Sequence, residues 1–84
     1  MQPRPALSQQ AVTFAVKSIR RQLTKSPHAV DTAEGIHGFW IEWPEPLAPT
    51  PVTEEALKLL EEEGFVERVL VDTRELWRKK TKAD

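Results

Sequence analysis

The sequence contains no cysteine, only three glycines and no apolar run that approaches the length of a membrane span. Without thiols, neither disulfides nor thiolate metal sites can hold the fold, so its stability has to come from packing and local signals. A membrane-spanning helix needs about 18 to 20 apolar residues. The first five residues, Met-Gln-Pro-Arg-Pro, also lack the apolar segment of a secretion signal. We therefore expect a cytoplasmic protein.

The residue sets that build common active sites are missing as well. There is no cysteine nucleophile, no glycine-rich loop and no serine set beside a base. His28, Asp31, Glu34 and His37 recur at intervals of three, and the last two would share a helix face, as metal-binding carboxylate–histidine pairs do. A second such pair is missing, so capping acids and two surface histidines are the preferred interpretation. We expect no enzymatic activity, no metal and no cofactor.

Charge is distributed unevenly along the 84 residues. Residues 1–25 carry +5, residues 26–67 carry -9 and residues 68–84 carry +3, within a net charge of -1. A chain of this length forms one domain with a thin core, since it hides only about 60% of its unfolded surface. We expect a tail over residues 1–6, a domain over residues 7–79 and a basic tail over residues 80–84. The asymmetric charge bears on partners and self-association rather than on the fold.

Helical periodicity is clearest between residues 7 and 23. Six apolar residues recur there every three or four positions and form one stripe, with Ser8 as the N-cap and Leu7 packing on Val12. Pro27 ends this helix. Phe14 lies off the stripe, on the side of Lys17 and Arg21, where it is either a contact point for a partner or packed beneath a tail or connector.

A second helix is predicted over residues 31–43. Asp31 or Thr32 followed by Glu34 is a capping signal, and Ile36 lies at helical spacing from Trp40 and Trp43. A strand over residues 39–43 is the competing prediction. The aromatic residues here fill the core, or else Phe39 and Trp43 border a partner groove, since tryptophan is enriched in binding hot spots.

Four prolines in residues 44–51 predict an extended connector, because each proline fixes φ and removes a hydrogen-bond donor. The third helix is expected to begin at Thr53, to point Ala56, Leu57, Leu59 and Leu60 inward and to end at Gly64. Phe65 would then cover Leu60, as in a Schellman ending.

A β-hairpin is predicted to close the domain. Residues 65–71 are rich in β-branched residues, Asp72 and Thr73 supply a turn, and residues 75–78 return as the partner strand. The predicted fold class is α+β, with three helices followed by a hairpin.

This order of elements resembles a winged-helix domain. Residues 52–68, VTEEALKLLEEEGFVER, are similar to the third helix and wing entry of bacterial winged-helix regulators. The resemblance implies that the third helix lies in the major groove and that the wing touches the DNA backbone. The connector before the third helix is longer and richer in proline than the tight turn of that family.

The sequence departs from the family where DNA reading would occur. The exposed side of the third helix is acidic, and phosphate repels acids. We therefore prefer a protein-interaction module that binds a protein partner or a second copy. Its candidate contact residues are Phe14, Phe39, Trp43, Glu54, Glu55, Lys58 and Glu62.

The alternative is a DNA-binding regulator that uses the wing and the basic ends. Its candidate contact residues are Lys17, Arg21, Arg68, Arg74, Arg78 and Lys79. Solvated charge is the preferred interpretation of each of these runs, as it is for the acids at residues 61–63.

Overall fold

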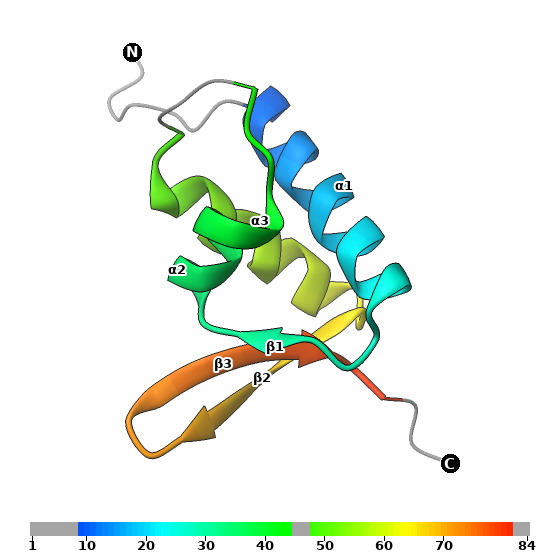
Figure 1. Cartoon of the computed structure of the whole chain (residues 1–84), viewed down its shortest axis with the longest axis vertical. Coiled ribbons are helices and arrows are strands. Elements are labelled where there is room, and N and C mark those ends of the chain that lie inside the picture. Colours follow the sequence, from blue (N-terminus) through cyan, green and yellow to red (C-terminus); the bar gives the residue numbers. More distant parts are fainter. Residues whose placement is uncertain (1–8, 45–47, 82–84) are drawn as a thin grey trace.

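Three helical segments pack on one another above a three-stranded antiparallel sheet (Figure 1). The computed structural model describes residues 9–44 and 48–81. The elements follow the order α1 (Gln9–Lys25), β1 (Val30–Asp31), α2 (Ala33–Gly35), η1 (Ile36–Trp40), α3 (Thr50–Glu62), β2 (Val66–Val71) and β3 (Arg74–Lys79). The α+β class is therefore as predicted, although the sheet has one strand more than the expected hairpin.

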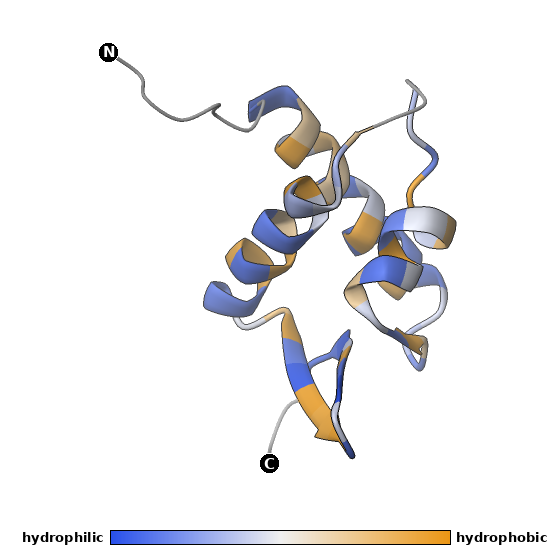
Figure 2. Ribbon diagram, turned by 90° about the vertical axis from the view of Figure 1, so that its left-hand side faces the viewer, coloured by the Kyte–Doolittle hydropathy of each residue, from blue (hydrophilic) through white to orange (hydrophobic). Residues whose placement is uncertain are grey.

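The first helix forms as the apolar stripe predicts. Val12, Ala15, Ile19 and Leu23 are buried on α1, and hydrophilic residues alternate with hydrophobic ones along the helices (Figure 2). The predicted cap at Ser8 and the contact of Leu7 lie outside the described residues.

The strand β1 was not predicted. It pairs Val30 with Arg78 and Asp31 with Trp77, so β3 becomes the central strand in the order β1-β3-β2. Two residues are too few to show an alternating pattern, and their partner strand lies more than 40 residues further along the chain. The strand is thus a product of the tertiary fold.

The second helix is shorter than predicted. Its N-cap is Thr32, whose hydroxyl accepts a hydrogen bond from the amide of Gly35 at 3.1 Å, so the capping signal was correct. The helix then widens into the π-helical turn η1 and ends at Trp40 rather than at residue 43. The alternative strand over residues 39–43 is wrong, because Phe39 and Trp40 are helical.

The third helix begins at Thr50, three residues before the predicted start. Pro51 lies in its first turn, where a missing amide hydrogen costs nothing because that position has no intrahelical acceptor. Thr53 is therefore not a cap but a buried residue inside α3. Leu59, predicted to point inward, is 38% exposed, whereas Ala56, Leu57 and Leu60 are buried as expected.

The end of α3 follows the prediction closely. Gly64 has a φ of 80°, and its amide donates to the carbonyl of Glu61 at 3.0 Å, while the amide of Phe65 donates to the carbonyl of Leu60 at 2.9 Å. These two bonds define a Schellman ending.

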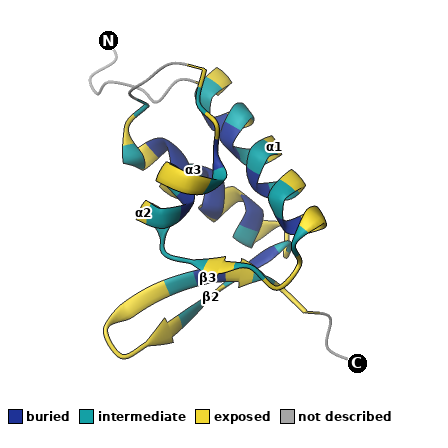
Figure 3. Ribbon diagram, in the orientation of Figure 1, coloured by how far each residue is buried: buried dark blue, intermediate teal, exposed yellow. Residues whose placement is uncertain are grey.

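The hairpin follows directly. Val66 pairs with Lys79 and Val71 with Arg74 across the two-residue loop at Asp72 and Thr73. Its base is buried through Val66 and Trp77, and its far end is exposed (Figure 3).

Candidate protein-interaction surface

The outward side of α3 presents the acidic residues that the sequence singled out. Glu54, Lys58 and Glu62 are exposed and Glu55 is half-buried; these four residues are the acidic face of α3. None of them forms an ion pair among residues 9–44 and 48–81. The acidic face thus combines three carboxylates with one cation, and none of the four forms an ion pair within the described part of the chain.

Phe39 is the most exposed large hydrophobic residue of the described chain, with 86% of its surface accessible. It lies on η1, which packs against both α1 and α3. The neighbouring Ile36 points into the core and is fully buried. The π-helical turn thus buries one apolar side chain and leaves a phenyl ring in water.

Phe14 and Trp43, the other predicted aromatic contacts, lie against one another. Their ring centroids are 5.7 Å apart, and both side chains are half-buried against the core. The indole nitrogen of Trp43 also donates to the carbonyl of His37 at 3.0 Å. Both rings therefore have structural partners within the chain.

His37 was expected on the surface, and the structure corrects this expectation. Its ring is half-buried, with Nδ1 2.6 Å from the hydroxyl of Thr53 and Nε2 2.8 Å from the carbonyl of Ala48. Because a carbonyl oxygen only accepts, Nε2 carries a hydrogen and donates it to Ala48; in this tautomer Nδ1 accepts from the hydroxyl of Thr53. The sequence analysis placed Thr53 at the start of the third helix, and for that reason it did not predict a buried bond from its side chain.

No group of three or more His, Asp or Glu side chains within the described ranges is arranged to hold a metal ion. The four residues at intervals of three instead have separate surroundings. Asp31 accepts from the amide of Thr32 at 2.8 Å, Glu34 and His28 are exposed, and His37 is bound as described above.

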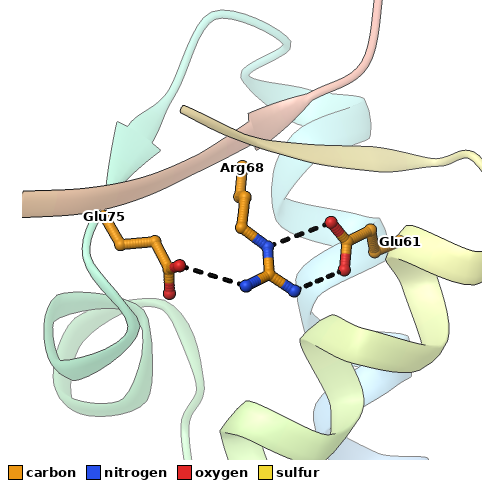
Figure 4. Close-up of polar contacts among 3 residues, drawn as sticks. All are labelled: Glu61, Arg68 and Glu75. Atoms are coloured by element: carbon orange, nitrogen blue, oxygen red, sulfur yellow. Dashed lines mark hydrogen bonds and ion pairs between the residues drawn. The ribbon is translucent and has the colours of Figure 1, made fainter. Parts of the chain in front are cut away.

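Arg68, a candidate DNA contact on the hairpin, is held between two carboxylates (Figure 4). Its guanidinium forms a two-pronged pair with Glu61, at 2.7 and 3.0 Å, and donates to Glu75 at 3.1 Å. It also lies 4.9 Å above the ring of Trp77. The hydrogen bonds from Arg68 lower the pKa of Glu61, and both carboxylates raise the pKa of Arg68. This cation is thus neutralised within the chain.

The other basic candidates differ in their surroundings. Arg78 donates to Glu67 at 2.7 Å, and the ammonium group of Lys79 lies 5.8 Å from the centre of the Phe65 ring. Arg74, beside the hairpin loop, is exposed and has no ion pair with any residue that the structure describes. The hairpin therefore offers one unengaged arginine.

The cations of α1 gather on its outward side. Lys17, Arg20, Arg21 and Lys25 are the basic face of α1, and with Thr24 they line a shallow hollow of about 430 Å³. Arg20 at its border pairs with Glu63 at 2.6 Å, at the end of α3. The predicted candidates Lys17 and Arg21 thus belong to one continuous surface.

Comparisons with protein-family models, curated proteins and solved structures find no match to this chain. No helix in the described part of the chain has the length and apolar character needed to cross a membrane.

Proposed function

We propose that the chain is a winged-helix-like protein-interaction module without catalytic activity. The support for a winged-helix arrangement is the order of elements, with a short strand after α1, a hairpin after α3 and the sheet order β1-β3-β2. The sequence similarity of residues 52–68 to such domains points the same way.

The observation that carries the functional proposal is the charge around α3. In a winged helix that binds DNA, the third helix and the wing approach the phosphates, and lysine and arginine strengthen binding there. Here the corresponding helix carries the acidic face, and Arg68 on the hairpin is bound by Glu61 and Glu75. A phosphate would have to displace these carboxylates before it met the arginine. The surface therefore favours a partner with positive charge.

Phe39 supplies the apolar contact for such a partner. In such a contact the aromatic ring enters a pocket of the partner, and charged residues of the module orient the approach. We infer a protein partner that presents an apolar pocket bordered by lysine or arginine.

DNA binding is the second candidate, and one observation favours it. The basic face of α1 and Arg74 provide cations that have no ion pair among the described residues, with the exception of Arg20. Under this alternative the acidic face takes no part in binding.

A capture experiment beside a gel shift separates the two. The immobilised protein is incubated with lysate of the native host, and retained proteins are identified for the unmodified chain, for Phe39→Ser and for the triple variant Glu54→Lys, Glu55→Lys and Glu62→Lys. Arg74→Ala serves as the matched surface control. We expect partners that both altered proteins lose and that Arg74→Ala retains.

In the gel shift, the unmodified protein should bind DNA no better than about 10⁻⁴ to 10⁻⁶ M at physiological salt, the range of non-specific contacts. The triple lysine variant should bind DNA more tightly, because its α3 then attracts phosphate. A sequence-specific complex at nanomolar concentration that survives salt at about 150 mM and is lost in Arg74→Ala would overturn the proposal.

A further inference from the structure

The two long helices divide the charge of the molecule between them. From Gln9 to Lys25, α1 contains four cations and no acid. From Thr50 to Glu62, α3 contains four glutamates and one lysine. Each helix therefore presents an outward surface of essentially one sign.

Most of these charges form no ion pair with residues 9–44 or 48–81. In the described structure, the only ion pair on the basic face is that of Arg20 with Glu63. On α3 only Glu61 is paired, with Arg68. Among the described residues, the charges of the two helices without an ion pair are Lys17, Arg21, Lys25, Glu54, Glu55, Lys58 and Glu62.

Their spacing along the two helices matches. With a rise of about 1.5 Å per residue, the row from Lys17 to Lys25 spans roughly 12 Å, and the row from Glu54 to Glu62 spans the same distance. Leu59, 38% exposed, lies beside this acidic row and adds an apolar contact. When one helix lies along the other, the cations at the two ends of the basic row can therefore face Glu54 and Glu62, while Lys58 occupies the middle of the acidic row.

The basic face also has a contact with the end of α3 within one molecule. The ion pair between Arg20 and Glu63 joins the border of the basic face to the end of α3, and the two helices pack on one another. A two-fold axis near this border would place α1 of each copy on α3 of the other, so that both contacts form at once. Such reciprocal pairing is the property of a closed dimer interface.

We propose that the chain forms a two-fold dimer in which the basic face of α1 binds the acidic face of α3 of a second copy. A nucleic acid is a poorer occupant, because it would use the basic face alone and leave the acidic face without a partner. A second copy uses both surfaces and leaves neither unpaired. This inference rests on the proposed interaction function and names one partner for it.

Sedimentation of the full chain tests the dimer. We expect a dimer at low ionic strength that dissociates in about 0.5 M salt. The dissociation constant should be at least tenfold larger at the higher salt concentration, since salt screens exposed charges. The basic-face variant Lys17→Glu with Arg21→Glu and the acidic-face variant Glu55→Lys with Glu62→Lys should each be monomeric. The control Arg74→Glu with Lys80→Glu makes the same change in net charge as the basic-face variant and should still dimerise.

Mixing the two monomeric variants gives the sharpest result. One then carries acids on both helices and the other carries bases on both, so an equimolar mixture should restore a dimer that contains one of each. Restoration also shows that both variants are folded, and circular dichroism of each checks this independently.

Three outcomes overturn the dimer: a monomeric unmodified chain at low salt, a basic-face variant that still dimerises, and a mixture that stays monomeric. A monomer that shifts DNA through Lys17 and Arg21 would assign the basic face to phosphate instead. A monomer that still captures a host protein through Phe39 would refute the dimer and leave the proposed interaction function in place.

Discussion

The hydroxyl of Thr53 and Nδ1 of His37 are 2.6 Å apart and join the buried side of α3 to the turn η1. Thr53 is fully buried. Among the described residues, its hydroxyl forms a side-chain hydrogen bond with His37 alone. The other ring nitrogen, Nε2, donates a hydrogen bond to the carbonyl of Ala48, just before α3 begins. A single imidazole thus fixes the start of α3 to the preceding turn.

Thr53→Val should lower the free energy of unfolding by roughly 1 to 2 kcal/mol. Valine keeps the shape but removes the donor, which leaves Nδ1 of His37 without a partner in a half-buried site. Urea denaturation of the variant gives the value directly. Thr13→Val, an exposed threonine of α1, is the matched control and should change stability by less than about 0.5 kcal/mol. Equal changes in the free energy of unfolding in both variants would show that the hydrogen bond between Thr53 and His37 does not stabilise the fold.

Neighbouring leucines of α3 provide a test of the core. Leu60 is fully buried and Leu59 is 38% exposed. Leu60→Ala should destabilise by about 2 to 5 kcal/mol, because both transfer energy and packing are lost. Leu59→Ala should cost less than about 1 kcal/mol. The same denaturation measurement serves for both, and a Leu60→Ala value below about 0.5 kcal/mol would contradict its placement in the core.

Gly64→Ala should also reduce stability, although the space around the glycine is open. An added Cβ meets no atom within 4 Å, so the cost comes from the backbone, whose φ of 80° disfavours a side chain by about 1 kcal/mol or more. Gly64→Asn should cost less, since asparagine adopts this conformation more readily. Gly38→Ala is the control, because that site is equally open and its φ is not positive. Thermal unfolding of both variants checks this prediction. A melting temperature of Gly64→Ala equal to or above that of Gly38→Ala would contradict a backbone cost at Gly64.

The parts of the fold that were predictable are those with a local cause. The stripe of α1, the Gly64 ending of α3 and the hairpin each follow from residues close in sequence, and all three are present. The strand β1 and the Thr53–His37 bond depend on contacts 16 or more residues apart, and local patterns do not report such contacts. The end of the second helix was missed because the turn widens at Ile36 instead of continuing with α-helical spacing.

Prediction of the candidate surface was uneven for a similar reason. Counting charges locates the acids of α3 and the cations of α1 without knowledge of the fold. It does not show that Arg68 is bound by Glu61 and Glu75, or that Phe14 meets Trp43, because these contacts form only when separate elements come together. Periodicity placed Trp43 but not Phe39 at helical spacing with Ile36, and in the structure Trp43 is half-buried whereas Phe39 is exposed.

The pair of Arg68 and Glu61 predicts a specific pH dependence. The pKa of Glu61 is lowered from its ordinary value of 4.5, chiefly by the hydrogen bonds that Arg68 donates to it. The folded state therefore favours the ionised carboxylate, and this contribution is present at neutral pH and is lost as the pH falls through the lowered pKa. The effect should be small, because the side chains of both residues are more than one-third exposed.

Glu61→Gln should remove this part of the acid sensitivity. We expect the difference in unfolding free energy between pH 7 and pH 3, measured by urea denaturation, to be smaller in Glu61→Gln than in the unmodified chain. Glu54→Gln is the matched control, since Glu54 lies on the same helix without an ion pair among the described residues, and it should keep the original difference. If Glu61→Gln and Glu54→Gln lost stability to acid in parallel, Arg68 would not be stabilising the ionised form of Glu61 in the folded state.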